Sequence, residues 1–464
     1  MKHQTQFILL IIISSACIAA SQSPKTEIKV FEPSDLRNKY NGIQNKSLAV
    51  ANFGEVHWGR TLVGLVYLGS PFDGCSPLQP LKLQHDNEQG DMEDPEQSIV
   101  LLGRGGCFFE VKARNAQQIG AKAVIIVDSQ DENLTDFLPL GNARDDTIHI
   151  PTVIIDMKSG NLIKEKLVEK SNLPVSIGIS FHVPKVPKDV TVDIWTTSSD
   201  LYGFDLIRES FNIKVKFGDL VKFVPHALVW YCRPCAEKNF VNTTTDVNCV
   251  SSGRHCSPDP DGAGPLTGSA ILIENLRQLC VYEKSENAWW DYFIAFNRSC
   301  VGTKDLESCS YQAIKDIGVS VDGITKCVRD SFGGGPVESA ENSFFQREND
   351  LIFKKRIQTW PTIFINGQMY RGDLHPVDDI FDAICDGFEN PPDICSGRVE
   401  DVEKARKDVE QTWLIITGVV LIISVIFVII FVLYKRAIRR EVNQEMELMI
   451  SSSMQKYMAL REEK

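Results

Sequence analysis

The sequence predicts a multi-domain α/β protein that continues into one transmembrane helix and a short tail. Three observations lead to this fold class. Short apolar segments typical of strands alternate with helical segments through most of the chain. A 22-residue run without a charged side chain spans residues 413–434. Of the 13 cysteines, 12 lie between Cys75 and Cys395, ahead of that run.

The chain begins with the pattern of a secretory signal peptide, which we place at residues 1–20. A basic residue precedes a short apolar run, and small residues follow it. The run 413–434 is long enough to cross a bilayer core of about 30 Å as one helix. Basic residues follow it at once, so the positive-inside rule places a tail, 435–464, in the cytosol. Residues 399–412 form the expected stalk.

The cysteines after the signal peptide predict disulfide bonds, because an even number in an oxidising compartment favours pairing. Cys75 and Cys107 are alone in the first half of the chain, and we expect them to pair. Spacing does not define the connectivity of the others, which are Cys232, Cys235, Cys249, Cys256, Cys280, Cys300, Cys309, Cys327, Cys385 and Cys395. Their spacing is not that of a zinc site, and no metal or cofactor is predicted.

Two further features agree with a lumenal or extracellular location. Four N-x-S/T sequons precede the membrane segment, at Asn45, Asn133, Asn242 and Asn297. The formal net charge is −12, which argues against nucleic acid as a partner.

The first domain is placed at residues 29–183. Strands are predicted at 62–68, 98–102, 123–127 and 152–155, and a helix at 110–119. The turn before this helix reads Arg104-Gly105-Gly106-Cys107-Phe108-Phe109. Glycines before a helix leave backbone N–H groups available for an anion, and Arg104 adds a planar cation beside them. From the turn alone, a solvated arginine without a ligand is the more common case.

The second domain is placed at residues 190–398. A strand at 190–195, a helix at 201–211 and a strand within 220–231 precede a helical insertion. A hairpin at Asn366-Gly367 and a helix at 377–385 complete the domain. The motif Cys232-x-x-Cys235 suggests a redox pair, but it follows the second strand. A reactive thiolate is favoured at the start of the first helix, where no cysteine stands, so we favour structural bridging.

Several motifs carry resemblances to known families. The segment Val-x-Leu-Gly-Arg104-Gly-Gly-Cys-Phe-Phe and the following helix resemble the protease-associated domain, which implies a β-sandwich-like core without catalytic residues. The order of elements in the second domain resembles the thioredoxin fold, in which the proline matching Pro361 is cis. With Gly253-Arg-His-Cys-Ser-Pro-Asp-Pro-Asp261 and Trp289-Trp-Asp-Tyr292 included, nearly the whole chain resembles plant vacuolar sorting receptors.

This resemblance implies a non-enzymatic cargo receptor. Such a receptor binds short peptide determinants of soluble proteins in the Golgi lumen and cycles between Golgi, trans-Golgi and endosomal or prevacuolar membranes. Plant members carry EGF-like modules before the membrane, whereas only 17 residues, none of them cysteine, separate Cys395 from Trp413 here. The residues that map onto the cargo-binding site are Asn52, Phe53, Gly54, Arg104, Gly105, Cys107 and Phe109. A loop at 135–146 is expected to cover it.

The tail carries one candidate sorting signal. Tyr457-Met-Ala-Leu460 fits the Y-x-x-hydrophobic pattern that clathrin adaptors bind, with pockets for the tyrosine and the apolar residue. Met449-Ile450 is a second, poorer candidate. Two other functions stay open from the sequence. One is a membrane-bound thiol–disulfide oxidoreductase that uses Cys232 and Cys235, and the other is a structural membrane glycoprotein without cargo.

Overall fold

The structure is a computed structural model. It describes residues 26–81, 98–134, 137, 141, 147–169, 173–231, 247–257, 266–303, 305–375, 377–396, 431, 433–436, 446 and 448–454. The chain divides into two compact units, Met1–Pro392 and Asp393–Lys464. Every strand of the described chain lies in the first unit.

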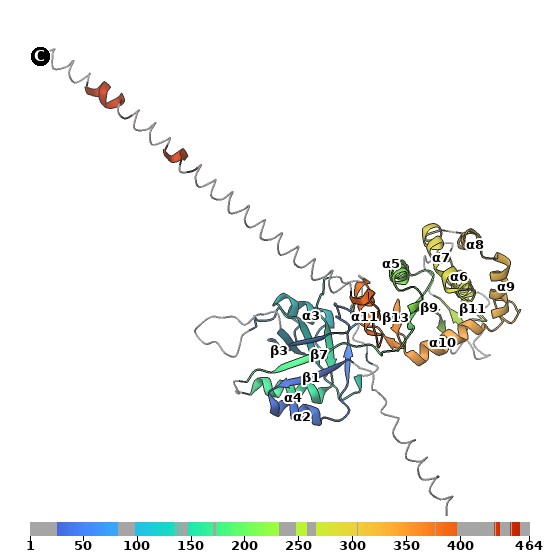
Figure 1. The fold of residues 1–464 in the computed structure, drawn as a ribbon, viewed down its shortest axis with the longest axis horizontal. Coiled ribbons are helices and arrows are strands. Elements are labelled where there is room, and N and C mark those ends of the chain that lie inside the picture. The colour runs from blue at the N-terminus through green and yellow to red at the C-terminus, as the bar shows by residue number, and fades with distance from the viewer. Residues whose placement is uncertain are drawn as a thin grey trace, which may run out of the picture. The chain divides into compact units, whose positions relative to one another are not determined.

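The N-terminal part of the first unit builds a seven-stranded mixed sheet in the order β1-β7-β3-β4-β5-β6-β2. Figure 1 labels β1, β3 and β7 of this sheet. The neighbours from β3 to β6 are parallel, and the outer pairs are antiparallel. All residues of β4 and β5 are buried, as expected for parallel strands covered on both faces. The strands are β1 (Glu27–Glu32), β2 (Leu48–Val50), β3 (Thr61–Leu68), β4 (Ser98–Gly103), β5 (Ala123–Val127), β6 (Thr152–Ile155) and β7 (Ser176–Ser180).

Three helices cover this sheet: α2 (Ser34–Gly42), α3 (Phe109–Gln118) and α4 (Met157–Val168). Figure 1 shows α3 on one side of the sheet and α2 with α4 on the other. Parallel strands need such crossover connections, and α3 supplies the one between β4 and β5. The arrangement is therefore one sheet between helices, where the resemblance implied a sandwich-like core.

A four-stranded sheet follows, in the order β14-β13-β8-β9. The parallel strands β8 (Val190–Thr196) and β9 (Val221–Ala227) are joined through α5 (Leu201–Phe217). The strand β13 (Thr362–Ile365) pairs antiparallel with β8 and with β14 (Gln368–Met369), and α11 (Asp378–Asp386) closes the fold. The Trp360–Pro361 bond is cis, as the resemblance to the thioredoxin fold implied.

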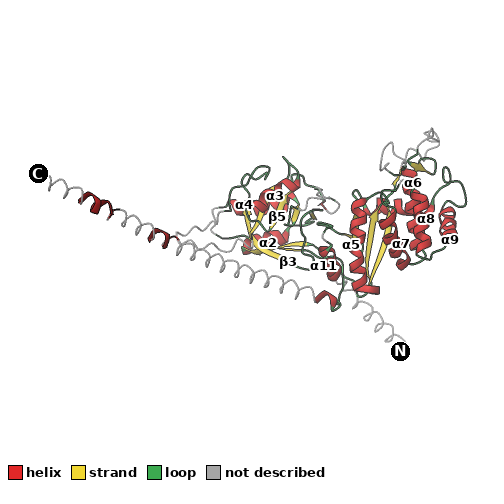
Figure 2. Cartoon of the chain, turned by 90° about the horizontal axis from the view of Figure 1, so that it is seen from above, coloured by secondary structure: helices red, strands yellow, loops and turns green. Residues whose placement is uncertain are grey.

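An insertion between β9 and β13 holds a small sheet and five helices. Figure 2 shows α6, α7, α8 and α9 side by side. Three disulfides join parts of this insertion: Cys249–Cys256, Cys280–Cys327 and Cys300–Cys309. The elements are β10 (Trp230–Tyr231), β11 (Cys249–Val250), β12 (His255–Cys256), α6 (Gly268–Tyr282), α7 (Glu286–Ser299), α8 (Leu306–Asp316), α9 (Val321–Ser331) and α10 (Ser343–Lys355).

Several predicted features lie outside the described residues. They are the signal peptide 1–20, the stalk 399–412, most of the transmembrane segment 413–434, Cys232, Cys235, Asn242, Tyr457 and Leu460. Within the part of the chain that the structure describes, no helix has the length and apolar character needed to cross a membrane. Cys385 and Cys395 are both disulfide-bonded. Met449 and Ile450 are exposed on a helical segment.

Candidate functional site

The turn between β4 and α3 has a fixed backbone. Gly105 and Gly106 have φ angles of +104° and +82°, which residues with a side chain rarely adopt. Cys107 is bonded to Cys75, and a Cβ on Gly106 would lie 2.9 Å from the Cys75 sulfur. Lys112, buried in α3, donates a hydrogen bond of 2.6 Å to the carbonyl oxygen of Gly105. Burial lowers the pKa of Lys112.

This turn presents backbone donors to solvent. The Arg104 amide donates to the Val127 carbonyl oxygen at 2.9 Å, but among the described residues no acceptor takes the amides of residues 105–108. Gly105 and Gly106 are exposed, and Phe108 keeps 75% of its surface in solvent. These amides precede α3, where the helix dipole favours negative charge. The turn can therefore bind a carboxylate or successive carbonyl oxygens.

The Arg104 guanidinium lies beside the turn and is already paired. Its Nη1 donates to Asp128 at 2.7 Å and to Glu132 at 2.8 Å. Burial opposes the charge, but the two carboxylates outweigh burial, so the pKa of Arg104 is raised. The guanidinium also lies over the Phe137 ring, 4.6 Å from its centroid. Within the described residues Nε and Nη2 have no acceptor.

The predicted cover loop meets the other predicted segment, Asn52-Phe53-Gly54, at one described point. The Gly141 amide donates to the Asn52 side chain at 2.8 Å. A Cβ on Gly141 would lie 2.3 Å from the Phe53 ring, so only glycine fits there. Phe53 is fully buried in the core under the sheet, and Phe109 packs against that core and against Phe137. Phe53 therefore supports the segment from the core, and its part in cargo binding stays a prediction.

The predicted segment is also held by a loop of the thioredoxin-like fold. The Gly54 amide donates to the Asp373 carboxylate at 3.1 Å, and the Asp373 amide returns a bond of 3.2 Å to Gly54. The Gly372 amide donates to Ala51 at 3.0 Å. Burial raises the pKa of Asp373 to about 7, although the Gly54 amide opposes the rise. We call these contacts the joint.

Among the residues that the structure describes, one arginine at the joint has no counter-charge. Arg371 lies in the chain between Gly372 and Tyr370, whose ring packs at a tilt against Trp58 with the centroids 5.6 Å apart. Its Nη1 is buried, and among the described residues no acceptor pairs with it. Burial lowers the pKa of this guanidinium to about 10. Sequence patterns did not identify the joint, because its two sides are far apart in the chain. Gly54 and Asp373, for example, are separated by 319 residues.

The remaining predicted positions are the start of the helix α5, the glycosylation sequons and His149. Before α5 the Ser198 amide donates to the Asn275 side chain at 2.8 Å, so a side chain of the insertion contacts the turn that leads into this helix. The sequon residues Asn45 and Asn133 are exposed, and Asn297 is partly exposed in α7. His149, close to the joint, lies 2.7 Å from Glu55.

Comparisons with known proteins agree with this architecture. The family models that match are the vacuolar sorting receptor thioredoxin-like domain, over residues 190–385, and the PA domain, over residues 62–163. The chain is similar to vacuolar sorting receptors across both of these domains. Vacuolar-sorting receptor 7 of Arabidopsis thaliana is 30% identical, and the match covers 83% of this chain and 63% of the relative. Vacuolar-sorting receptor 1 of Pisum sativum is 29% identical, and the match covers 84% of this chain and 64% of the relative.

The chain thus spans less than two thirds of the length of these curated relatives. Among solved structures, oxidised Mtb DsbA is 11% identical with a TM-score of 0.29, and the match covers 46% of this chain and 92% of that one. An aminopeptidase from Aneurinibacillus sp. strain AM-1 is 18% identical with a TM-score of 0.22, and the match covers 34% of this chain and 30% of that one. Overlaps this small do not bear on function.

Proposed function

We propose that this protein is a transmembrane cargo receptor. It binds soluble proteins in the Golgi lumen through short peptide determinants and sorts them to vacuole- or lysosome-like compartments. The observation that carries the proposal is the turn 105–108, a segment whose amides have no acceptor among the described residues and which lies beside the paired guanidinium of Arg104. The family of both domains supports it.

The peptide would bind through its oxygens. Carbonyl or carboxylate oxygens accept from the amides of residues 105–108, while Nε and Nη2 of Arg104 donate to the same or a neighbouring group. Asp128 and Glu132 keep the guanidinium in place, so little side-chain entropy is lost on binding. The exposed ring of Phe108 offers apolar contact for a peptide side chain. Asn52, Gly54 and Phe109 form the supporting wall.

The thioredoxin-like domain, residues 190–398 in this proposal, holds the cargo-binding domain, 29–183, through the joint. The proposal assigns no catalytic reaction and no cofactor to it. The alternative, an oxidoreductase, requires Cys232 and Cys235 to exchange thiols. Insulin reduction by the full chain that disappears in a Cys232→Ser variant would favour the alternative, whereas alkylation of native protein that labels no cysteine would favour the receptor.

Membrane passage and traffic complete the proposal. Residues 1–20 direct the chain into the lumen, 413–434 anchor it, and the tail 435–464 recruits clathrin adaptors through Tyr457 and Leu460. This route places the binding turn in the lumen and the sorting signal in the cytosol.

The decisive test is an Arg104→Ala variant of the full chain in detergent. Cargo is first captured from a lumenal extract on wild-type protein, and a peptide of the captured cargo is then titrated calorimetrically. Loss of a charge-assisted contact of about 1.5–3 kcal/mol lowers affinity roughly 10- to 150-fold. The matched control is Arg37→Ala, which removes the same charge from α2, on the other side of the sheet. Equal affinity of wild type and Arg104→Ala contradicts the assignment.

A further inference from the structure

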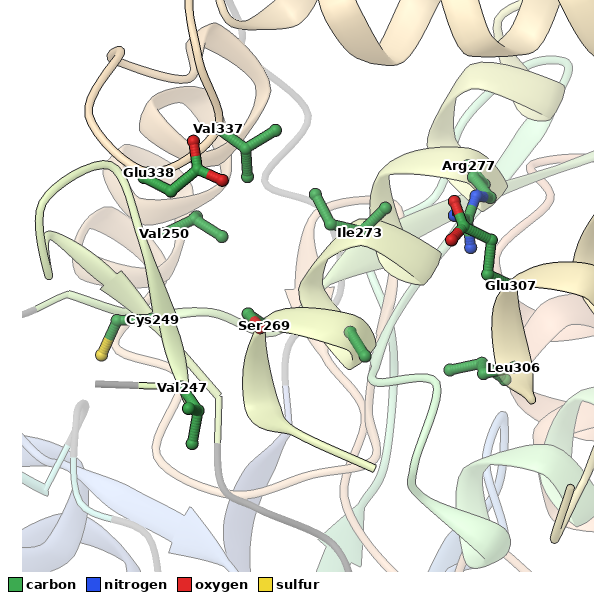
Figure 3. Close-up of a pocket in the computed structure, with 11 residues that line it drawn as sticks. Val247, Cys249, Val250, Ser269, Ile273, Arg277, Leu306, Glu307, Val337 and Glu338 are labelled. Atoms are coloured by element: carbon green, nitrogen blue, oxygen red, sulfur yellow. The ribbon is translucent and has the colours of Figure 1, made fainter. Parts of the chain in front are cut away.

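The insertion of the thioredoxin-like domain contains a pocket of about 390 Å³, far from the turn at Arg104 in the chain. Figure 3 shows its walls: β11 and the loop at Val337 on one side, and α6 with the start of α8 on the other. The volume falls within the range of small-ligand pockets, about 300–1,000 Å³. The apolar lining comes from Val250, Ile273, Leu306 and Val337. Such a lining suits an aliphatic side chain.

Charged side chains stand at the two ends of this pocket. Arg277 and Glu307 lie together at one end, and Glu338 lies at the other (Figure 3). The Glu307 side chain is 67% exposed and uses only Oε1 to accept from Arg277, at 2.9 Å. Glu338 is exposed, and among the described residues nothing pairs with its carboxylate.

The cation of the pocket is already compensated. Arg277 is 4% exposed in its side chain and lies between Glu274, at 3.3 Å, and Glu307. Its guanidinium also covers the Tyr311 ring, 4.6 Å from the centroid. Glu274 is in turn held by the Tyr292 hydroxyl at 2.6 Å. An anionic ligand would have to displace Glu307, whereas a cationic ligand meets two carboxylates that can accept without any rearrangement.

We propose that this pocket binds an apolar side chain next to a basic residue, within an extended peptide segment of a partner protein. The apolar side chain fills the space over Ile273, and the basic group donates to Glu307 or Glu338. Val247, 58% exposed at the edge of the pocket, extends the apolar surface along which the peptide lies. This site does not depend on the function proposed for the Arg104 turn.

The test uses fluorescence anisotropy with full-length protein in detergent and three labelled octapeptides. All three have the same Gly-Ser flanks, and their centres read Leu-Leu-Lys-Lys, Ser-Ser-Lys-Lys and Leu-Leu-Glu-Glu. The first should bind at least tenfold more tightly than either of the others, because only it satisfies both the apolar wall and the carboxylates. Equal binding of all three, or no binding of the first, overturns the proposal.

Variants then locate the binding. Ala270→Leu extends a side chain into the pocket from α6, and Glu338→Lys reverses the charge at one end. Each should weaken the Leu-Leu-Lys-Lys peptide at least fivefold. Glu341→Lys makes the same charge change on an 86% exposed side chain that does not line the pocket, and should change affinity less than twofold. Full affinity in both pocket variants, with both folded by circular dichroism, overturns the proposal.

A further measurement with the Arg104→Ala variant distinguishes the pocket from the turn at Arg104. That variant should bind the Leu-Leu-Lys-Lys peptide with wild-type affinity, whether or not it has lost cargo. A matching loss of this peptide in Arg104→Ala would mean that the peptide binds at the turn, and would overturn the assignment to the pocket.

Discussion

Replacing Asp373 by asparagine should make the joint stronger at neutral and alkaline pH. Asp373 is 8% exposed, and one of its carboxylate oxygens accepts from the Gly54 amide. Asparagine keeps an acceptor oxygen in that position and removes a charge that burial disfavours. The neighbouring carboxylates of Asp379 and Glu55 add to the rise in the pKa of Asp373, whereas His149 opposes it.

The size of the effect follows from the pKa of Asp373, which burial raises from 3.8 to about 7. One pKa unit is worth about 1.4 kcal/mol, so ionising this group costs about 4 kcal/mol more in the folded protein than in the unfolded chain. The folded state holds its proton more tightly between these two pH values. The contribution of Asp373 to stability is therefore complete below pH 3.8 and is lost as pH rises to about 7.

Hydrogen exchange of the peptide that contains Gly54 measures this local effect in the full chain. At each pH we compare the opening free energy of the Gly54 amide in wild type and in Asp373→Asn. The advantage of the variant should grow by about 3 kcal/mol between pH 5 and pH 8, since that interval contains most of the titration. Asp219→Asn, the same change at an exposed position, should show no such growth. A constant difference between wild type and Asp373→Asn would refute the reasoning.

Four other substitutions have defined outcomes. Arg371→Met removes a cation whose buried Nη1 has no acceptor among the described residues, so it should raise the free energy of unfolding by about 1–3 kcal/mol. A decrease in this free energy in denaturation experiments would contradict the reasoning. Cys75→Ser opens a loop with a sequence separation of 32 residues, which should cost about 4 kcal/mol by urea unfolding, and a loss below about 1 kcal/mol would contradict that expectation. Tyr457→Ala and Leu460→Ala should each shift the protein toward the cell surface or the vacuolar membrane in imaging, with cargo binding unchanged. If both variants keep the wild-type distribution among membranes, the sorting signal lies elsewhere in the tail, and Met449-Ile450 is the next candidate.

Much of the first sheet was predictable because its central strands are buried on both faces. The apolar runs at 98–102 and 123–127 became β4 and β5, with one residue added to β4. Short strands such as β2 and β7 have little hydrophobic pattern in the sequence, because they are strands through their pairing with neighbouring strands. The helix predicted to end at residue 211 continues to Phe217, where Gly218, with φ +56°, ends it. Gly218 was the signal that would have placed this boundary.

The site was predictable only where it is local. The turn at Arg104 could be recognised because glycines, cysteine and helix start follow one another in sequence. Its carboxylate partners lie 24 and 28 residues further along, in positions that only the parallel pairing of β4 and β5 brings close. The burial of the Phe53 ring could not be predicted, because an aromatic residue in a binding segment has the same sequence pattern whether its ring points inward or outward.

The joint limits how the two domains can be exchanged between related proteins. Ala51 and Gly54 use backbone atoms to meet Gly372 and Asp373, and the Val183 amide donates to Asp386 at 2.9 Å near the end of the thioredoxin-like fold. A cargo-binding domain transplanted alone would leave these groups without partners, beside the very segment expected to support the ligand. Exchange between relatives should therefore succeed when both domains move together, and chimaeras that divide the chain near residue 185 should bind cargo poorly even when each half folds.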